Sequence, residues 1–252
     1  MGATIAVKGE VLHPGTYGIQ EGERLSSIIQ RAGGFRANAY PYGAVFEREQ
    51  IRELEEKNRS DLIQRVQSEA AQVRIIPGMD VEHQMTAQAA VLQYKSTLEK
   101  LQNLPPEGRL VIHISTNIKQ WANTSADIQV RAGDVLYIPK RPNLVMVDGA
   151  VYNSTGVTYK PGKSAGWYLH QAGGPTQMAN KKATFVIRAD GSVVGGAGGL
   201  FSGGVESAAM RPGDMVVVPE KAYTINTKWK TALESAQLAY AVGIAIQVAR
   251  SF

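Results

Sequence analysis

The sequence predicts an α+β protein built from two copies of one small β-rich domain, and three observations support this prediction. First, a segment of 28 residues recurs without a gap at an offset of 140 residues. Second, the 26 glycines gather where the pattern indicates turns, which favours short strands over long helices. Third, apolar residues show helical spacing in two stretches outside the repeat, one interrupting the first copy and one ending the chain.

The repeat aligns residues 7–34 with residues 147–174. A valine, a glycine and a second valine alternate at its start, as in a strand with a glycine at a bulge or a close backbone approach. A turn and a second short strand follow, and then a short helix that the sequence Ala-Gly-Gly terminates. The identical positions are Val7, Gly9, Val11, Gly22, Ala32, Gly33 and Gly34 in the first copy and Val147, Gly149, Val151, Gly162, Ala172, Gly173 and Gly174 in the second.

Each copy is completed by a second shared motif, in which Gly-Asp forms a turn before an apolar strand that ends in proline. Residues 131–139 match residues 211–219 in this way. The offset is 80 here rather than 140, so the first copy carries 60 additional residues. Asp134 and Asp214 occupy the same place in the two copies, which is typical of turn residues rather than of paired catalytic carboxylates.

The additional residues, from 47 to about 106, are predicted to form a helical hairpin. Two stretches of helical spacing are separated by residues 75–78 and ended by Pro105-Pro106. The hairpin either packs on its own domain or makes a lateral contact with a neighbouring subunit. Because the second copy lacks any such insertion, both β domains are expected to fold without it. The apolar positions are Ile51, Leu54, Leu62, Ile63, Val66, Ala87, Ala90, Val91, Tyr94, Leu98 and Leu101.

The predicted organisation is therefore a first domain over residues 1–142, a second domain over 143–222 and a terminal segment over 223–252. That segment is predicted to be an amphipathic helix, which between residues 229 and 249 would be about 31 Å long, close to the hydrocarbon thickness of a bilayer. The helix either enters a membrane or covers the β domains or a sister subunit. The residues expected to contact the membrane or neighbouring helices are Trp229, Leu233, Tyr240, Gly243, Ile244 and Ile246.

Composition and motifs argue against catalysis, metal binding and nucleic-acid binding. The chain has no cysteine and its four histidines are widely separated, so no thiolate or histidine metal site is indicated. The sequence Pro161-Gly162-Lys163-Ser164 lacks the glycine that a phosphate loop requires at position 157. The net charge of +5 comes without a run of basic residues, so no nucleic-acid-binding face is indicated. No catalytic residue, metal ligand or cofactor is therefore predicted.

Two aromatic residues, Trp167 and Tyr168, are the candidates for stacking on a sugar ring. Exposed aromatic side chains offer a flat apolar face with a polar edge, which suits a sugar. Both residues lie in the short helix of the second copy, where packing into the core is the alternative.

The order of the shared motifs resembles the SLBB domain, a β-grasp-like module that binds soluble ligands. The resemblance covers residues 5 to about 220 and implies two tandem domains of this kind. Three motifs occur in the same order in each copy. The matching segments are residues 7–11, 14–17, 32–34 and 131–139 in the first copy and 147–151, 172–174 and 211–219 in the second.

The resemblance implies a component of a bacterial capsule or exopolysaccharide export channel, similar to the Wza-like family. Members of that family form rings across the periplasm, and their C-terminal helices assemble into a barrel in the outer membrane. The implied partners are further copies of the chain, the exported polysaccharide, an inner-membrane polysaccharide co-polymerase and the outer membrane of a Gram-negative bacterium. The alternative is a periplasmic accessory module of the same domain type, which binds carbohydrate or a partner and is not itself a pore.

A ring would also explain the polar residues of the terminal helix. Lys230, Glu234 and Gln237 would be costly in lipid, but in a ring they would face a water-filled lumen. We therefore expect the helix to enter the membrane only as an oligomer. Replacing Ile244 and Ile246 with lysine is expected to abolish membrane insertion and secretion while both β domains stay folded.

The sequence departs from the family pattern in two respects. It contains neither the family's N-terminal export domain nor its lipidated cysteine, which would fit a C-terminal fragment of a longer protein. The predicted helical hairpin has no counterpart in the compact form of the domain.

Overall fold

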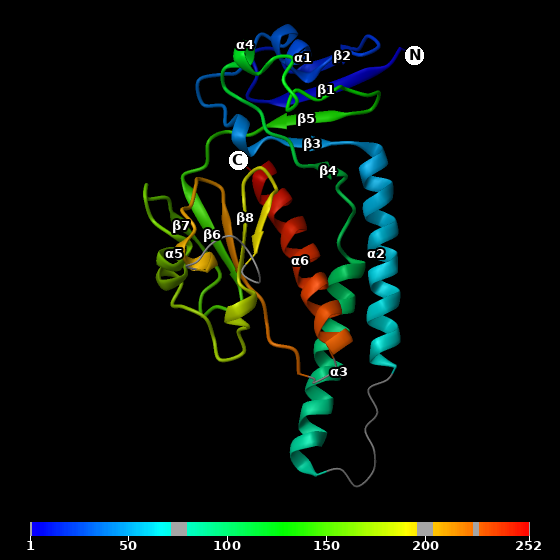
Figure 1. The fold of residues 1–252 in the computed structure, drawn as a ribbon, viewed down its shortest axis with the longest axis vertical. Coiled ribbons are helices and arrows are strands. Elements are labelled where there is room, and N and C mark those ends of the chain that lie inside the picture. The colour runs from blue at the N-terminus through cyan, green and yellow to red at the C-terminus, as the bar shows by residue number, and fades with distance from the viewer. Residues whose placement is uncertain (1, 72–79, 196–203, 224–226, 252) are drawn as a thin grey trace.

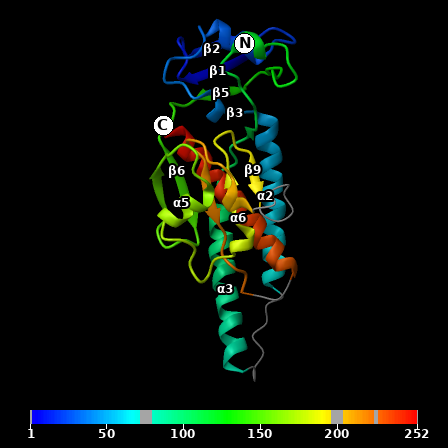
Figure 2. The ribbon, with the colours of Figure 1, turned by 60° about the vertical axis from the view of Figure 1, so that its left-hand side comes forward.

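The computed structural model describes residues 2–71, 80–195, 204–223 and 227–251. It contains two five-stranded sheets and a layer of long helices, which confirms the α+β class (Figure 1). The first domain lies at one end of the molecule, and helices α2 and α3 run away from it. Helix α6 lies between those two helices and the second domain, as Figures 1 and 2 both show.

The first sheet has the strand order β2-β1-β5-β3-β4. Strands β1 and β5 are parallel, and the other neighbours are antiparallel. Leu25, Ile28 and Trp121 from two short helices join Ile5 and Leu136 of the sheet in the buried core. The elements are β1 (Thr4–Gly9), β2 (Gly15–Gly18), α1 (Leu25–Arg31), a 3-10 turn (Pro41–Gly43), β3 (Val45–Glu47), β4 (Arg109–Leu110), α4 (Ile118–Trp121) and β5 (Val135–Ile138).

The second sheet repeats this topology, as the internal repeat predicts. Its strand order is β7-β6-β10-β8-β9, and β6 and β10 are again the parallel pair. Tyr168 and Leu169 from a short helix pack on Val147 and Val216. The elements are β6 (Leu144–Gly149), β7 (Thr155–Thr158), α5 (Ala165–Gln171), a 3-10 turn (Lys181–Ala183), β8 (Phe185–Ile187), β9 (Val193–Gly195), a 3-10 turn (Val205–Ser207) and β10 (Met215–Val218).

The repeated glycine at the end of β1 and of β6 is required by a close backbone approach. Gly9 has a φ of 80° and Gly149 a φ of 97°, a region that residues with a Cβ rarely adopt. A Cβ would lie 2.1 Å from the carbonyl oxygen of Ile138 at the first position and 2.2 Å from that of Val218 at the second. The predicted close approach is therefore confirmed in both copies.

The repeated Gly-Asp turn also has the same geometry in both copies. The N–H of Gly133 donates to Thr4 at 2.9 Å, and that of Gly213 donates to Leu144 at 2.8 Å. In each turn the aspartate accepts the backbone N–H three residues before it, at 2.7 Å for Asp134 and 2.8 Å for Asp214. Both aspartates therefore act in turns, as their repetition predicts.

Each of these buried aspartates also pairs with an arginine that follows the strand next to the central one. Arg48 after β3 donates to Asp134 through Nε at 2.9 Å and Nη2 at 2.8 Å. Arg188 after β8 lies 2.7 Å from Asp214, counted from its Nη1. Burial raises the pKa of the Asp214 carboxyl, and the hydrogen bond from Arg188 offsets part of that effect. The pair ties the turn before the central strand to the end of its neighbour.

The predicted hairpin consists of α2 (Glu49–Ala70) and α3 (Val81–Gln102), while its expected break at residues 75–78 lies outside the described residues. It is inserted between β3 and β4, where residues 188–192 alone join β8 to β9 in the second copy. The chain returns to the sheet at Gly108, whose N–H donates to Glu55 Oε2 at 2.7 Å.

The hairpin packs chiefly on the terminal helix rather than in a sheet core. Leu62, Val66 and Leu101 are buried in one cluster with Ala232 and Leu233 of α6 (Thr227–Arg250). None of the described hairpin residues belongs to either sheet core. Deleting the hairpin would therefore spare both sheets but would uncover apolar residues of α6.

The repeated ion pair leads to a test of stability. Asp134→Asn and Asp214→Asn each leave a largely buried guanidinium without its charge partner, so each variant should lose about 3 kcal/mol of unfolding free energy. Denaturant unfolding followed by circular dichroism measures this loss. Glu49→Gln, which removes a pair exposed to solvent on α2, is the control and should change stability by less than about 1 kcal/mol. Equal effects in all three variants would contradict a structural role for the buried pairs.

Candidate functional site: the C-terminal helix and the cleft beside it

The first half of α6 packs in a three-helix layer. Ala232, Leu233 and Ala236 are buried against Leu62 of α2 and Leu101 of α3. Small side chains allow close helix contacts, and the two alanines of α6 occupy this interface. The hairpin therefore covers this half of the helix within one chain.

The second half of α6 covers the outer face of the second sheet. Ala241 is buried with Phe185, Ile187 and Met215, which point away from the core that the short helix α5 covers. Alternate residues of a strand point to opposite faces of a sheet, so this sheet has apolar side chains on both faces. The helix lies over the second apolar face, with Leu238, Val242, Ile244, Ala245 and Val248 at its margin.

The C-terminal end of α6 is held against the first domain by charges. Arg250 Nη1 lies 2.7 Å from a carboxylate oxygen of Glu107, and Arg250 Nη2 donates to Glu47 at the end of β3. The Tyr137 hydroxyl donates to the carbonyl of Arg250 at 3.4 Å. A single helix thus contacts the hairpin, the second sheet and the edge of the first domain.

The apolar residues predicted for a membrane or oligomer contact face protein here. Leu233 and Ile246 are buried, and Ile244 packs on the second sheet. Gly243 lies so close to Leu104 that a Cβ would come within 2.2 Å of its Cδ1. The ring of Tyr240 lies below an ammonium group, 5.4 Å from Lys100 Nζ. The side chain of the sixth residue, Trp229, lies outside the described residues.

Among the polar residues of α6, Glu234 contacts the second domain, Gln237 lines a cleft and Lys230 is exposed to solvent. Glu234 accepts a hydrogen bond from Asn180 Nδ2 at 3.4 Å and lies 4.0 Å from Lys230 Nζ. Gln237 lines the cleft, and its Oε1 is buried without a hydrogen-bond partner among the described residues. A lumen-facing position therefore stays a prediction for an assembly in which α6 has moved.

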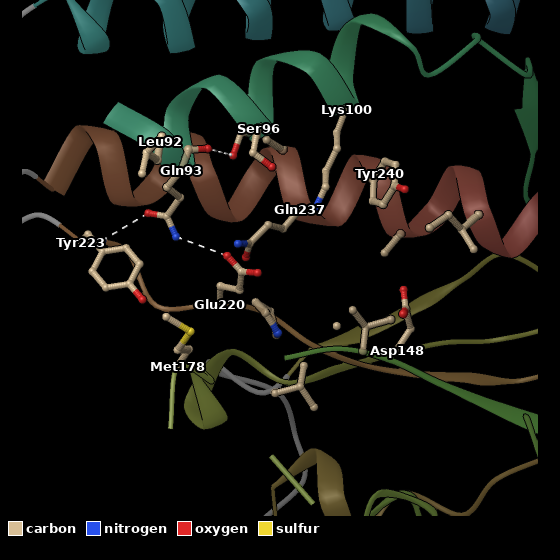
Figure 3. Close-up of a pocket in the computed structure, with 18 of the residues that line it drawn as sticks. Leu92, Gln93, Ser96, Lys100, Asp148, Met178, Glu220, Tyr223, Gln237 and Tyr240 are labelled. Carbon is tan, nitrogen blue, oxygen red and sulfur yellow. Dashed lines mark hydrogen bonds between the residues drawn. The ribbon is translucent and has the colours of Figure 1, made fainter. Parts of the chain in front are cut away.

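The cleft has a volume of about 650 Å³ and lies between α3, α6 and the second sheet (Figure 3). Gln93 crosses one end, where its Nε2 donates to the carbonyl of Lys221 at 2.8 Å and its Oε1 accepts the N–H of Tyr223 at 3.3 Å. Lys100 and Asp148 also line the cleft, one from each side. Asp148 and Glu220 supply two carboxylates to the cleft and Lys100 supplies one ammonium group, and the remaining lining residues are neutral.

Two residues whose contact was not predicted from the sequence join the two β domains. Arg109, at the start of β4, donates from Nη2 to the carbonyl of Ala189 at 2.7 Å. Burial lowers the pKa of this guanidinium to about 10, because the charged form is desolvated. The hydroxyl of Tyr40 donates to the carbonyl of Pro212 at 2.9 Å, and burial raises its pKa. Both contacts join distant segments, so no local pattern indicates them.

The two candidate sugar-stacking residues have different surroundings. Tyr168 is fully buried, and its hydroxyl bonds to the backbone of Lys160, so its ring offers no free face. Its assignment as a stacking residue is therefore wrong, because the alternative of core packing applies. Trp167 is partly buried and packs edge-on against Tyr168, and the ammonium groups of Lys160 and Lys163 lie 5.6 and 5.7 Å from its ring centroid.

Two general features of the described residues bear on function. No group of three or more histidine, aspartate or glutamate residues within them could hold a metal ion. One described helix, Lys230–Arg250, is long and apolar enough to cross a membrane, and 33% of its apolar window is buried in the protein. The core helix of a soluble protein passes the same test, so length and composition leave both roles open.

Comparison with known proteins agrees with this architecture. Residues 4–48, within the first domain, match the family model described as the SLBB domain, which agrees with the resemblance seen in the sequence. Two Escherichia coli relatives, both named polysialic acid transport protein KpsD, are each 26% identical to the chain over 144 residues. The aligned stretch covers 57% of this chain but only 23% of each relative. The chain is thus related to SLBB-domain proteins of polysaccharide export.

The contact at Gly243 provides a test of helix docking. In Gly243→Val the added side chain collides with Leu104, and overpacking of this kind costs about 1–3 kcal/mol. We expect faster hydrogen exchange over residues 230–250, measured by mass spectrometry. Adding Leu104→Ala in the same protein should restore protection, because it removes the colliding atoms. If the double variant exchanges as fast as the single one, loss of this contact is not the cause.

Proposed function

We propose that this chain is a non-enzymatic component of a polysaccharide export apparatus in the envelope of a Gram-negative bacterium. The SLBB match and the transport proteins among its relatives support this role. Helix α6 is the main structural support for this proposal. It is apolar and long enough to cross a membrane, and its own chain covers it only in part.

The hairpin supports assembly into an oligomer. Val81, Met85 and Leu92 of α3 lie within about 40° of one another around the helix axis, because their spacings of four and seven residues follow the helical repeat. Their exposed fractions are 72%, 65% and 67%. An exposed apolar stripe of this kind is typical of a protein contact. We propose that it contacts a neighbouring copy in a ring around the exported polymer.

In this proposal the docked α6 is a closed form of the protein. On assembly the helix leaves the hairpin and the second sheet, and its apolar side chains enter the outer membrane. Lys230, Glu234 and Gln237 then face the water-filled centre of a helical barrel, which avoids the cost of polar groups in lipid. An inner-membrane co-polymerase would deliver the polysaccharide to the ring.

The docked helix favours a second candidate function. If α6 stays on the second sheet, the chain is a periplasmic accessory module that binds carbohydrate or a partner. The burial of Leu233, Ala241 and Ile246 against the same chain supports this alternative. The two candidates differ in one physical event, which is the release of α6.

The substitution of Ile244 and Ile246 by lysine cannot distinguish these candidates. Ile246 is buried and Ile244 packs at the edge of the second sheet, so both lysines would also disrupt docking. A covalent link that leaves the apolar surface unchanged is a better test. The chain has no cysteine, so an introduced pair has no competing thiol.

We predict that Leu104→Cys with Gly243→Cys, which join α6 to the end of the hairpin, blocks secretion when oxidised. The Leu104 side chain reaches the position of a Gly243 Cβ, which brings the two cysteines close enough for a disulfide. Secretion is measured in a strain that lacks the native protein, together with oligomeric state in detergent. A reducing agent should restore both.

The matched control is Leu104→Ser with Gly243→Ser, which has nearly the same shape and forms no covalent link. It should secrete normally under all conditions. Normal secretion by the fully oxidised cysteine pair would show that α6 does not leave, and the accessory module would then be the better assignment.

A further inference from the structure

A second cleft lies on the second domain beside the loop that follows α5. It has a volume of about 530 Å³ and is open to solvent. Tyr152, which is 69% exposed, forms one wall. The side chains of Gln177 and Asn180 and three lysines, Lys181, Lys182 and Lys221, also line it. The cleft thus places an exposed aromatic ring beside amide and ammonium groups.

The ammonium groups of this cleft are available to a ligand. Within the described part of the chain, Lys181, Lys182 and Lys221 form no ion pair. Lys221 Nζ donates to the carbonyl of Gln177 at 3.0 Å, which holds it at the cleft and leaves two of its hydrogens. The nearby carboxylate of Glu234 is already engaged by Lys230 and Asn180.

The repeat shows that the fold does not require this chemistry. In the first domain the position of Tyr152 is Leu12, and the positions of Lys181 and Lys182 are Pro41 and Tyr42. Both domains have the same strand order, so Tyr152, Lys181 and Lys182 are specific to the second copy, whereas Lys221 has a basic counterpart in Arg141. Residues that a shared fold does not need are candidates for binding.

The corresponding surface of the first domain is covered by the second domain, whereas the cleft of the second domain is open to solvent. The guanidinium of Arg211 lies 4.5 Å from the ring centroid of Tyr42, and Tyr40 bonds to the backbone of Pro212. The first domain thus uses this region to dock on the second domain. In the second domain Lys181 and Lys182 are exposed to solvent.

We propose that this cleft binds an acidic saccharide, with sugar carboxylates at Lys181 and Lys182 and a sugar ring against Tyr152. The C–H face of a sugar packs on an aromatic ring, the amides of Gln177 and Asn180 match hydroxyl groups, and ammonium groups pair with carboxylates. The inference rests on the proposed export function and adds the chemical class of the polymer. Trp167 is a poorer platform, because two lysines already cover its ring.

Binding of short oligosaccharides to the full chain tests the site by calorimetry. An oligogalacturonate and an oligomer of sialic acid should both bind, maltotetraose should bind at least about tenfold more weakly, and added salt should weaken the acidic ligands. Lys181→Gln with Lys182→Gln should weaken acidic binding about tenfold or more, as should Tyr152→Ala, while Tyr152→Phe keeps the ring and should retain affinity.

The matched control is Lys160→Gln with Lys163→Gln, which removes the same charge from the same domain outside the cleft. It should change affinity by less than about twofold if binding is local. An equal loss in both double variants, or equal binding of maltotetraose, would overturn the site. Absence of acidic binding by the native protein would also overturn it, and normal secretion by the same protein would then leave the export role standing.

Discussion

Helix α6 buries Ala232 and Leu233 against the hairpin and Ala241 against the second sheet, and the arrangement of the molecule depends on this packing. The second sheet is apolar on both faces, and the hairpin joins α6 through an apolar cluster of its own. The outer face of the second sheet and the apolar face of the hairpin would both be exposed to water without α6. Because α6 satisfies them together, it holds the hairpin, the second domain and, through Arg250, the first domain in one body. Moving α6 would expose both apolar surfaces and break the ion pair of Arg250 with the first domain.

The two domains show how one framework carries different surfaces. The close approach at Gly9 and Gly149 and the buried aspartate of the Gly-Asp turn recur with nearly the same geometry. The loops around that framework differ. One copy replaces a short turn with the α2–α3 hairpin, and the other has lysines and Tyr152 where its sister has proline and apolar residues. The surfaces that we propose for binding and assembly therefore lie in the parts that the shared framework does not constrain.

Charged residues have two roles in this protein, and the role depends on whether the residue is buried or exposed to solvent. Asp134 and Asp214 are enclosed and satisfied by arginine and backbone donors, so they stabilise the framework. The lysines of the second-domain cleft remain in water, where a single ion pair is weak. Several such groups beside an aromatic ring can still select an acidic polymer, because their contributions add over repeated sugar units. Weak contacts of this kind suit the export role that we propose, because they release a polymer as readily as they hold it.

The repeat, the glycines, the Gly-Asp turns and the extent of the hairpin could all be predicted from the sequence, because each depends on local backbone rules or helical spacing. The pairing of Arg48 with Asp134 could have been found by extending the repeat, since Arg48 and Arg188 occupy the same position in it. The burial of Tyr168 and the contact of Arg109 with Ala189 could not, since distant segments create them. The apolar residues of α6 suit lipid and protein equally well. Only the tertiary structure decided that they face the hairpin and the second sheet, because that choice depends on which complementary surfaces lie within reach of the folded chain.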